Sequence, residues 1–209
     1  MSAGSLSLIH RHVPGEGNAA ATTLLLLHGT GGNENDLIGL GRTLLRGATL
    51  LSPRGRVLEN GMPRYFRRLA EGVFDLEDLQ RRTHELVEFI ENACSAYSLD
   101  ARRIVAIGYS NGANIAASTL LLRPETLSAA ILFRPMVPFV PKQLPDLGGK
   151  RILVMAGRHD PIAEPAESRH LVQLFSAAGA LVQVHWVDGG HELGEEDLTV
   201  ARSWLSEVP

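Results

Sequence analysis

The sequence predicts a doubly wound α/β fold, in which a mostly parallel sheet is covered by helices on both faces. Short apolar runs alternate along the chain with longer segments of helical period, which is the pattern of repeated strand–helix units. Several short runs are nearly continuous in Leu, Ile and Val, as expected of parallel strands that are buried on both faces. Right-handed crossovers between such strands place helices on both sides of the sheet.

Six runs carry the strand pattern, and turn residues bound each of them. They are residues 22–27, 48–51, 103–107, 128–133, 151–156 and 181–187. Residues 5–13 alternate more regularly between polar and apolar, so we expect an antiparallel edge strand there.

Apolar residues at steps of three and four predict five helices between and after these strands. Their apolar faces comprise Leu37, Leu40 and Leu44; Leu79, Thr83, Leu86, Ile90, Ala93 and Tyr97; Ala113, Ala116, Ala117, Leu120 and Leu121; Leu171, Leu174, Phe175 and Ala178; and Leu198, Ala201, Trp204 and Leu205.

The composition is that of an ordinary globular chain. Its 209 residues are 44% apolar and 21% charged, which suits one domain with a substantial core. No linker or repeat divides it, so we expect a single domain over residues 1–209. The net charge of −3 does not favour nucleic acid as a partner. A homodimer remains possible.

The location of the protein is suggested by what the sequence lacks. Cys94 is the one cysteine, so no internal disulfide can form, and no secretory signal or membrane-spanning apolar run is visible. We therefore expect a cytoplasmic protein with no integral membrane association.

The strongest chemical signal is G-x-S-x-G at Gly108, Ser110 and Gly112, between a buried run and an alanine-rich helical segment. A serine on a sharp strand-to-helix turn holds its hydroxyl clear of the sheet, and glycines on either side avoid collisions in the turn. The motif in this context predicts the α/β-hydrolase fold, with Ser110 as a catalytic nucleophile.

A second glycine-rich turn follows the run 22–27 and contains Thr30. A dinucleotide-binding loop is excluded because Glu34 occupies the third glycine position of G-x-G-x-x-G, and no G-K-[ST] follows. In a serine hydrolase the backbone N–H groups of Thr30 and Asn111 would instead hold the oxyanion. His28 is expected to support this loop rather than to transfer protons.

The catalytic base should follow the nucleophile, since the order on this fold is Ser, then Asp or Glu, then His. His170 and His185 lie within a predicted helix and strand, and His159 reads as a neighbour of the acid. We choose His191, which lies in a Gly-Gly-His turn after the last strand.

Asp160 is the expected acid because it follows the strand 151–156, at the sheet edge that His191 should reach. Asp188 is its main rival, whereas Asp146 precedes the strand and lies at the wrong end. A metal site formed by His159, Asp160, His185 and His191 is disfavoured because their spacing matches no zinc pattern. We expect no metal and no cofactor.

These motifs together resemble the phospholipase/carboxylesterase family of small α/β-hydrolases, which includes acyl-protein thioesterases. The resemblance is greatest to bacterial carboxylesterases and hydroquinone-stress hydrolases. It rests on five stretches, residues 26–37, 61–68, 108–114, 157–161 and 189–191. The resemblance implies Ser110, Asp160 and His191 as a triad, with Thr30 and Asn111 as the oxyanion hole. It leaves esters, thioesters and lysophospholipids open as substrates.

The substrate is expected to be a small carboxylic ester. No insertion after the strand 128–133 is long enough for a large cap, so the cleft should be shallow and suit short-chain or aryl esters with small acyl groups. The candidate walls of this cleft are Tyr65, Phe66, Phe74 and the turn 133–138 with Phe133 and Met136, although the aromatic residues could simply pack the segment 54–75 onto the body. Arg64, Arg67 and Arg68 could attract an acidic substrate, but we favour a solvated basic face.

Overall fold

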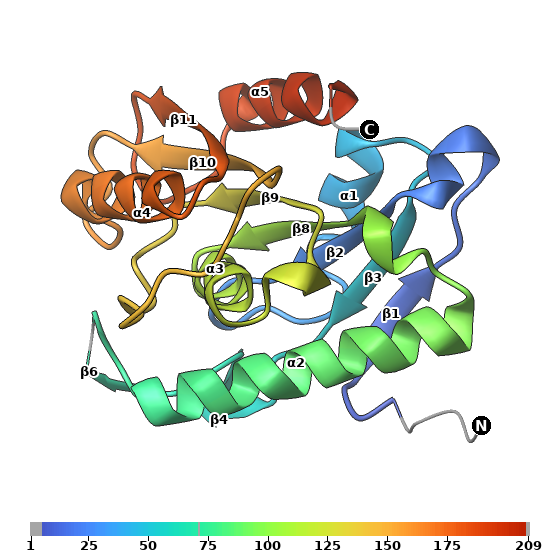
Figure 1. Ribbon diagram of the computed structural model, residues 1–209, viewed down its shortest axis with the longest axis horizontal. Coiled ribbons are helices and arrows are strands. Elements are labelled where there is room, and N and C mark those ends of the chain that lie inside the picture. Colours follow the sequence, from blue (N-terminus) through green and yellow to red (C-terminus); the bar gives the residue numbers. More distant parts are fainter. Residues whose placement is uncertain (1–5, 71, 208–209) are drawn as a thin grey trace.

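Seven strands form the central sheet, in the order β1-β3-β2-β8-β9-β10-β11 (Figure 1). The computed structural model describes residues 6–70 and 72–207. Every neighbouring pair in the sheet is parallel except β1 and β3, which are antiparallel. The strands are β1 (His10–Val13), β2 (Thr23–Leu27), β3 (Thr49–Pro53), β8 (Ile104–Tyr109), β9 (Ala129–Phe133), β10 (Arg151–Gly157) and β11 (Leu181–Val187).

The six predicted parallel strands are confirmed, with ends that move by at most two residues. The antiparallel edge strand is also confirmed, but it begins at His10 rather than near residue 5. Ser5 itself lies outside the described residues. In β2, every residue is buried, because helices cover both faces of the sheet.

Within the described residues, five α-helices cover the sheet, and Figure 1 shows how they are arranged around it. Residues of α2 (Leu76–Tyr97), α3 (Asn111–Leu122) and α4 (Pro165–Ala177) pack with one face of the strands, where Leu25 and Leu27 point. Residues of α1 (Ile38–Leu44) and α5 (Glu195–Ser206) pack with the other face, where Leu24 and Leu26 point. The described part of the chain also forms three short 3₁₀ turns, Gly17–Ala21, Ala101–Arg103 and Pro124–Thr126.

The segment between β3 and α2 is more structured than the sequence suggested. It forms two hairpins, β4 (Val57–Glu59) with β5 (Met62–Arg64), and β6 (Arg68–Ala70) with β7 (Val73–Phe74). Asn60 and Gly61 both have positive φ, 52° and 80°, as a two-residue hairpin turn requires. This Asn-Gly pair was the sequence signal for the first hairpin.

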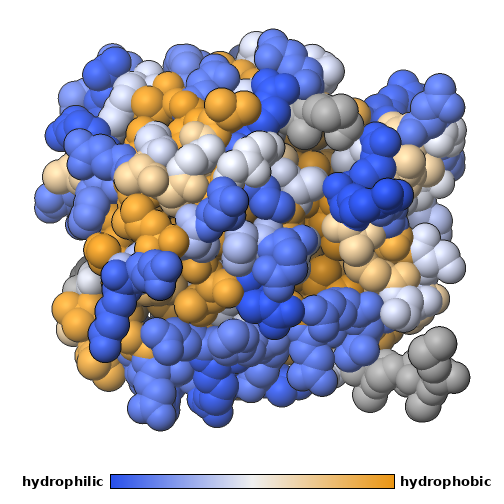
Figure 2. Space-filling model, in the orientation of Figure 1, coloured by the Kyte–Doolittle hydropathy of each residue, from blue (hydrophilic) through white to orange (hydrophobic). Residues whose placement is uncertain are grey.

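Apolar surface surrounds the second hairpin. Figure 2 shows it at the lower left of the molecule, over the β6–β7 hairpin and the first turn of α2. Leu69, Val73 and Leu76 are exposed there. Between β9 and β10, the segment 134–150 contains no helix or strand, which agrees with the expected absence of a large cap.

Candidate active site

Ser110 lies at the turn between β8 and α3. Its backbone has φ 51° and ψ −114°, a conformation that side-chain-bearing residues rarely adopt and that is kept here by the surrounding structure. Its N–H donates to the carbonyl of Phe133 on β9, at 2.9 Å. Close packing requires glycine at position 112, because a Cβ atom there would lie 2.0 Å from the carbonyl oxygen of Leu27.

Three side chains from separate loops meet at this turn. His191 Nε2 lies 2.9 Å from Ser110 Oγ, and His191 Nδ1 lies 2.8 Å from Asp160 Oδ2. The other oxygen of Asp160 accepts the N–H groups of Ile162 and Ala163, at 2.8 and 2.9 Å. Asp160 is thus buried but fully hydrogen-bonded, and it can hold the imidazole with Nδ1 protonated and Nε2 free to accept a proton.

The alternative residues weighed from the sequence pair with side chains other than Ser110 and His191. Asp188 pairs with His159 at 2.9 Å, and both side chains are largely exposed. His185 pairs with Glu196 at 2.7 Å, on the surface between β11 and α5. Among the described residues, no three His, Cys, Asp or Glu side chains are grouped as metal ligands.

Arg134 supports the loop that carries His191, and sequence reasoning missed it. This residue follows β9 with φ 52°, and its side chain is only 1% exposed. Its guanidinium donates to the carbonyls of Gly190 and Glu192, at 2.8 and 2.9 Å, and pairs with Asp197 on α5. Tyr109 also donates to the His191 carbonyl, at 3.3 Å. An arginine directly after an apolar strand was the available signal.

Two backbone N–H groups beside Ser110 are free to bind a ligand. Among the hydrogen bonds of the described residues, the N–H groups of Thr30 and Asn111 have no acceptor. The Thr30 loop is held from outside the sheet, because Gly31 N–H donates to the Pro63 carbonyl at 2.9 Å and Arg64 Nη1 donates to Thr30 Oγ1 at 2.9 Å. This arrangement suits the stabilisation of an oxyanion.

His28 holds the base of the same loop, as expected. Its Nδ1 lies 2.7 Å from the Gly29 carbonyl, and its Nε2 accepts the Gly55 N–H at 2.9 Å. These contacts require a neutral ring with the proton on Nδ1. Burial lowers the pKa of His28, which agrees with that state.

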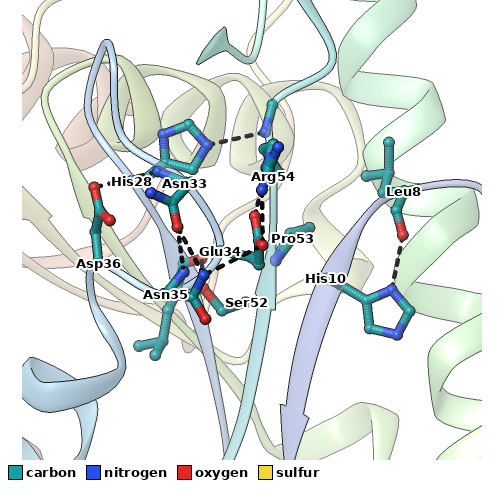
Figure 3. Close-up of polar contacts among 12 residues, drawn as sticks. Leu8, His10, His28, Asn33, Glu34, Asn35, Asp36, Ser52, Pro53 and Arg54 are labelled. Atoms are coloured by element: carbon teal, nitrogen blue, oxygen red, sulfur yellow. Dashed lines mark hydrogen bonds and ion pairs between the residues drawn. The ribbon is translucent and has the colours of Figure 1, made fainter.

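An ion pair joins this loop to the end of β3. Arg54 reaches the Glu34 carboxylate with two nitrogens, at 2.5 and 2.8 Å (Figure 3). The hydrogen bond from Arg54 lowers the pKa of Glu34. Asn33 accepts the Asn35 N–H at 2.9 Å in the same turn. The loop is therefore tied to β3 and closed on itself.

The meeting point of Ser110 and His191 opens into a cleft of about 620 Å³. Two of the predicted wall residues, Phe74 and Met136, line it. Tyr65, Phe66 and Phe133 do not line it: they are buried, with exposures of 3%, 0% and 0%. The prediction for these three is corrected. Aromatic residues near a cleft pack into the core when their backbone turns inward, and composition does not reveal that direction.

These buried aromatic residues support the site instead. Tyr65 donates its hydroxyl to the Pro53 carbonyl at 2.7 Å, and its N–H donates to Asn111 Oδ1 at 2.8 Å. Burial raises the pKa of Tyr65, so it stays neutral as a donor. Tyr65 therefore connects the hairpin segment to the first residue of α3.

The expected basic face is split between two environments. Arg64 and Arg68 line the cleft, whereas Arg67 points outward and pairs with Asp75 at 2.8 Å. The side chain of Arg64 is 4% exposed and that of Arg67 is 60% exposed. A solvated face therefore describes Arg67 only. Glu164 and Glu167 also line the cleft.

No helix within residues 6–70 or 72–207 is long and apolar enough to cross a membrane.

The sequence of the chain is similar to those of known proteins. A model of the phospholipase/carboxylesterase family matches residues 10–208. Over 193 residues the chain is 48% identical to the putative hydrolase MhqD of Bacillus subtilis, covering 92% of this chain and 96% of that protein.

Solved structures agree. A Bacillus cereus carboxylesterase is 48% identical with a TM-score of 0.94, covering 97% of this chain and 95% of its own. A carboxylesterase from Mesorhizobium loti is 33% identical with a TM-score of 0.87, and the match covers 95% of this chain and 94% of the carboxylesterase. These matches confirm the predicted α/β-hydrolase fold and the family resemblance drawn from the motifs.

Proposed function

The chain belongs to the phospholipase/carboxylesterase family, and its relatives include a putative hydrolase and a carboxylesterase. We propose that it hydrolyses short-chain or aryl carboxylic esters with Ser110 as nucleophile. One observation carries the proposal: Ser110, His191 and Asp160 are connected by hydrogen bonds of 2.9 and 2.8 Å at the base of a cleft.

The first step is acylation. Ser110 Oγ attacks the ester carbonyl while its proton passes to His191 Nε2, and Asp160 stabilises the imidazolium through Nδ1–H. The carbonyl oxygen becomes an oxyanion that accepts the N–H groups of Thr30 and Asn111. The tetrahedral intermediate then collapses, the C–O bond to the alcohol breaks, and His191 gives its proton to the leaving oxygen.

The second step is deacylation. Water attacks the acyl-Ser110 carbonyl and gives its proton to His191, and the same two N–H groups hold the oxyanion. Collapse releases the carboxylic acid and returns the proton to Ser110 Oγ. Each proton removed is returned, so the chemistry requires nothing beyond ester and water.

The acyl group should be small. The cleft is lined by polar and charged groups as well as by Phe74 and Met136, and the segment 134–150 does not form a cap that could enclose a long chain. These features favour short, water-soluble acyl groups over long-chain lipids. A thioester would meet the same three side chains, so a substrate panel must separate it from an ester.

The test is the rate of 4-nitrophenyl ester hydrolysis by the wild type and two variants. Ser110→Ala should lower kcat by about 10⁶-fold, as loss of a serine nucleophile does elsewhere. Ser206→Ala, on the exposed end of α5, should retain the wild-type rate. A fluorophosphonate should label Ser110 in the wild type.

Two outcomes would overturn the proposal. One is hydrolysis by Ser110→Ala at more than a few per cent of the wild-type rate. The other is a wild-type enzyme that turns over thioesters of matched acyl length far faster than oxygen esters.

A further inference from the structure

The hairpin segment contributes two arginines to the cleft, and Arg64 contacts the Thr30 loop. Arg64 ends β5 and Arg68 begins β6, and both line the cleft. The Nε of Arg64 donates to the Phe66 carbonyl at 3.3 Å, and its Nη1 donates to Thr30 Oγ1 at 2.9 Å. Within the described residues, its remaining terminal nitrogen, Nη2, has no acceptor. Arg64 therefore retains hydrogen-bond donors for a ligand.

One carboxylate serves both guanidinium groups. Glu59 on β4 lies 3.2 Å from Arg64 Nε through one oxygen and 2.7 Å from Arg68 Nε through the other. The contact with Arg64 is an ion pair without hydrogen-bond geometry, because the Nε–H of Arg64 is directed to Phe66. Among the described residues, two positive charges thus share one negative charge at this end of the cleft.

Burial increases the effect of that excess charge. Arg64 is 4% exposed, and burial lowers its pKa from the usual arginine value while leaving it protonated near neutral pH. The attraction between a cation and an anion is stronger where water is excluded, because the effective dielectric constant is lower there. The paired, planar donors of guanidinium also match the two oxygens of a carboxylate.

Two carboxylates also line the cleft, and among the described residues neither forms an ion pair with these arginines. They are Glu164, which precedes α4, and Glu167 in its first turn, which accepts the Val137 N–H at 3.2 Å. An anionic group is therefore favoured at the arginines and disfavoured near the glutamates. The leaving alcohol must lie beside His191, which protonates it, whereas Arg64 contacts Thr30 on the oxyanion side. The arginines should meet the acyl part of the substrate.

We propose that Arg64 and Arg68 form an anion-binding subsite that selects esters whose acyl part carries a carboxylate, that is, half-esters of short dicarboxylic acids. This proposal rests on the proposed esterase activity, and it adds the substrate class. Each good arginine–carboxylate contact should contribute about tenfold in kcat/KM.

The experiment compares two esters of equal acyl length, mono-4-nitrophenyl glutarate and 4-nitrophenyl valerate. The measured quantity is the ratio of their kcat/KM values after subtraction of spontaneous hydrolysis. The wild type should favour the glutarate half-ester, and added salt should reduce the ratio. Arg64→Met and Arg68→Met should each lower it by about tenfold. Because both esters share the Thr30 loop, the ratio cancels any general effect of Arg64 on that loop.

Arg67→Met is the matched control. It removes the same charge from the adjacent position, but its side chain lies outside the cleft and is largely exposed. The ratio should therefore stay at the wild-type value. A second control moves the carboxylate to the alcohol side, by comparing 4-acetoxybenzoate with phenyl acetate; here no preference for the acid is expected.

A binding measurement separates this proposal from the proposed activity. Free glutarate should raise the Tm of the wild type relative to sodium chloride at equal ionic strength, and the increase should be lost in Arg64→Met and Arg68→Met but kept in Arg67→Met. If neither ester is hydrolysed, the proposed function fails while this shift still supports the subsite. A wild-type ratio near one, an unchanged ratio in both cleft variants, or a preference only for an acid on the alcohol side would overturn the subsite.

Discussion

Arg134 and Asp197 form a bidentate ion pair in which both side chains are buried. The two terminal nitrogens of Arg134 lie 2.7 and 2.9 Å from the two oxygens of Asp197. The same guanidinium donates to the carbonyls on either side of His191. The pair therefore connects the α5 helix to the loop that carries the proposed catalytic base.

Arg134→Met should lower the free energy of unfolding by about 3–5 kcal/mol, because it leaves the Asp197 carboxylate buried without its partner. Denaturant titration measures this change. The kcat for a 4-nitrophenyl ester should also fall under conditions where the variant is folded, since the His191 loop loses two hydrogen bonds.

A double-mutant cycle provides the control. Asp197→Leu combined with Arg134→Met should cost less than the sum of the two single variants, because no charge is then buried alone. Strict additivity of the two costs would show that the ion pair is not the origin of the effect.

Asp160→Asn should reduce kcat by about 10⁴-fold while the fold is retained, because an amide no longer holds His191 with its proton on Nδ1. Asp188→Asn is the matched control, and it should change kcat by less than about twofold, because its side chain is exposed and pairs with His159 rather than with His191. A larger loss in Asp188→Asn than in Asp160→Asn would reverse the assignment of the acid.

Gly112→Ala should prevent stable folding, because its Cβ would lie 2.0 Å from the Leu27 carbonyl oxygen. That oxygen belongs to the backbone of β2, so it cannot move aside as the end of a flexible side chain could. Gly39→Ala, within α1, meets no atom within 4 Å and should raise the free energy of unfolding by about 0.5–1 kcal/mol. Circular dichroism during thermal unfolding distinguishes the two variants. A folded Gly112→Ala of wild-type Tm would contradict the packing described for the turn.

The free energy of unfolding should decrease as the pH falls below about 6.5, with His28 as one contributor. Burial lowers the pKa of this side chain in the folded protein. In that pH range the unfolded chain binds a proton that folded His28 does not, so acid favours unfolding. The slope from this one group approaches about 1.4 kcal/mol per pH unit until its folded pKa is reached.

Comparison with His28→Gln isolates this contribution, since the other histidines titrate in both proteins. The difference in stability between the two proteins should be constant above pH 6.5 and should diminish below it. A difference that is independent of pH would show that His28 is protonated equally in the folded and unfolded chains.

Much of the fold could be predicted because its elements are local patterns. The parallel strands are nearly continuous apolar runs, and the helices repeat apolar residues every three to four positions. Ser110 could be found because the tight turn around it requires glycine at positions 108 and 112, and this requirement is visible in the sequence as a local motif. His191 and Asp160 could be chosen because the end of each strand defines which loops meet at one edge of the sheet.

What could not be predicted depends on contacts between distant segments. Arg134 has no local pattern that marks it as a partner of Asp197, which lies far along the chain. Tyr65 and Phe66 were expected in the cleft because they are aromatic and nearby, yet their side chains turn into the core. Arg64 and Arg67 are neighbours in sequence, and only the hairpin geometry places one in the cleft and the other outside.

The hairpin segment also has a consequence for how this chain can evolve. The groups proposed to break the bond lie on loops at the ends of sheet strands, where a change disturbs the core. Arg64 and Arg68 lie outside that sheet. The first hairpin is constrained, because its Pro63 carbonyl holds the Thr30 loop. The described residues of the β6–β7 hairpin make no backbone hydrogen bond to that loop. This hairpin is therefore where descendants of this chain could change substrate preference while inheriting the hydrolytic centre intact.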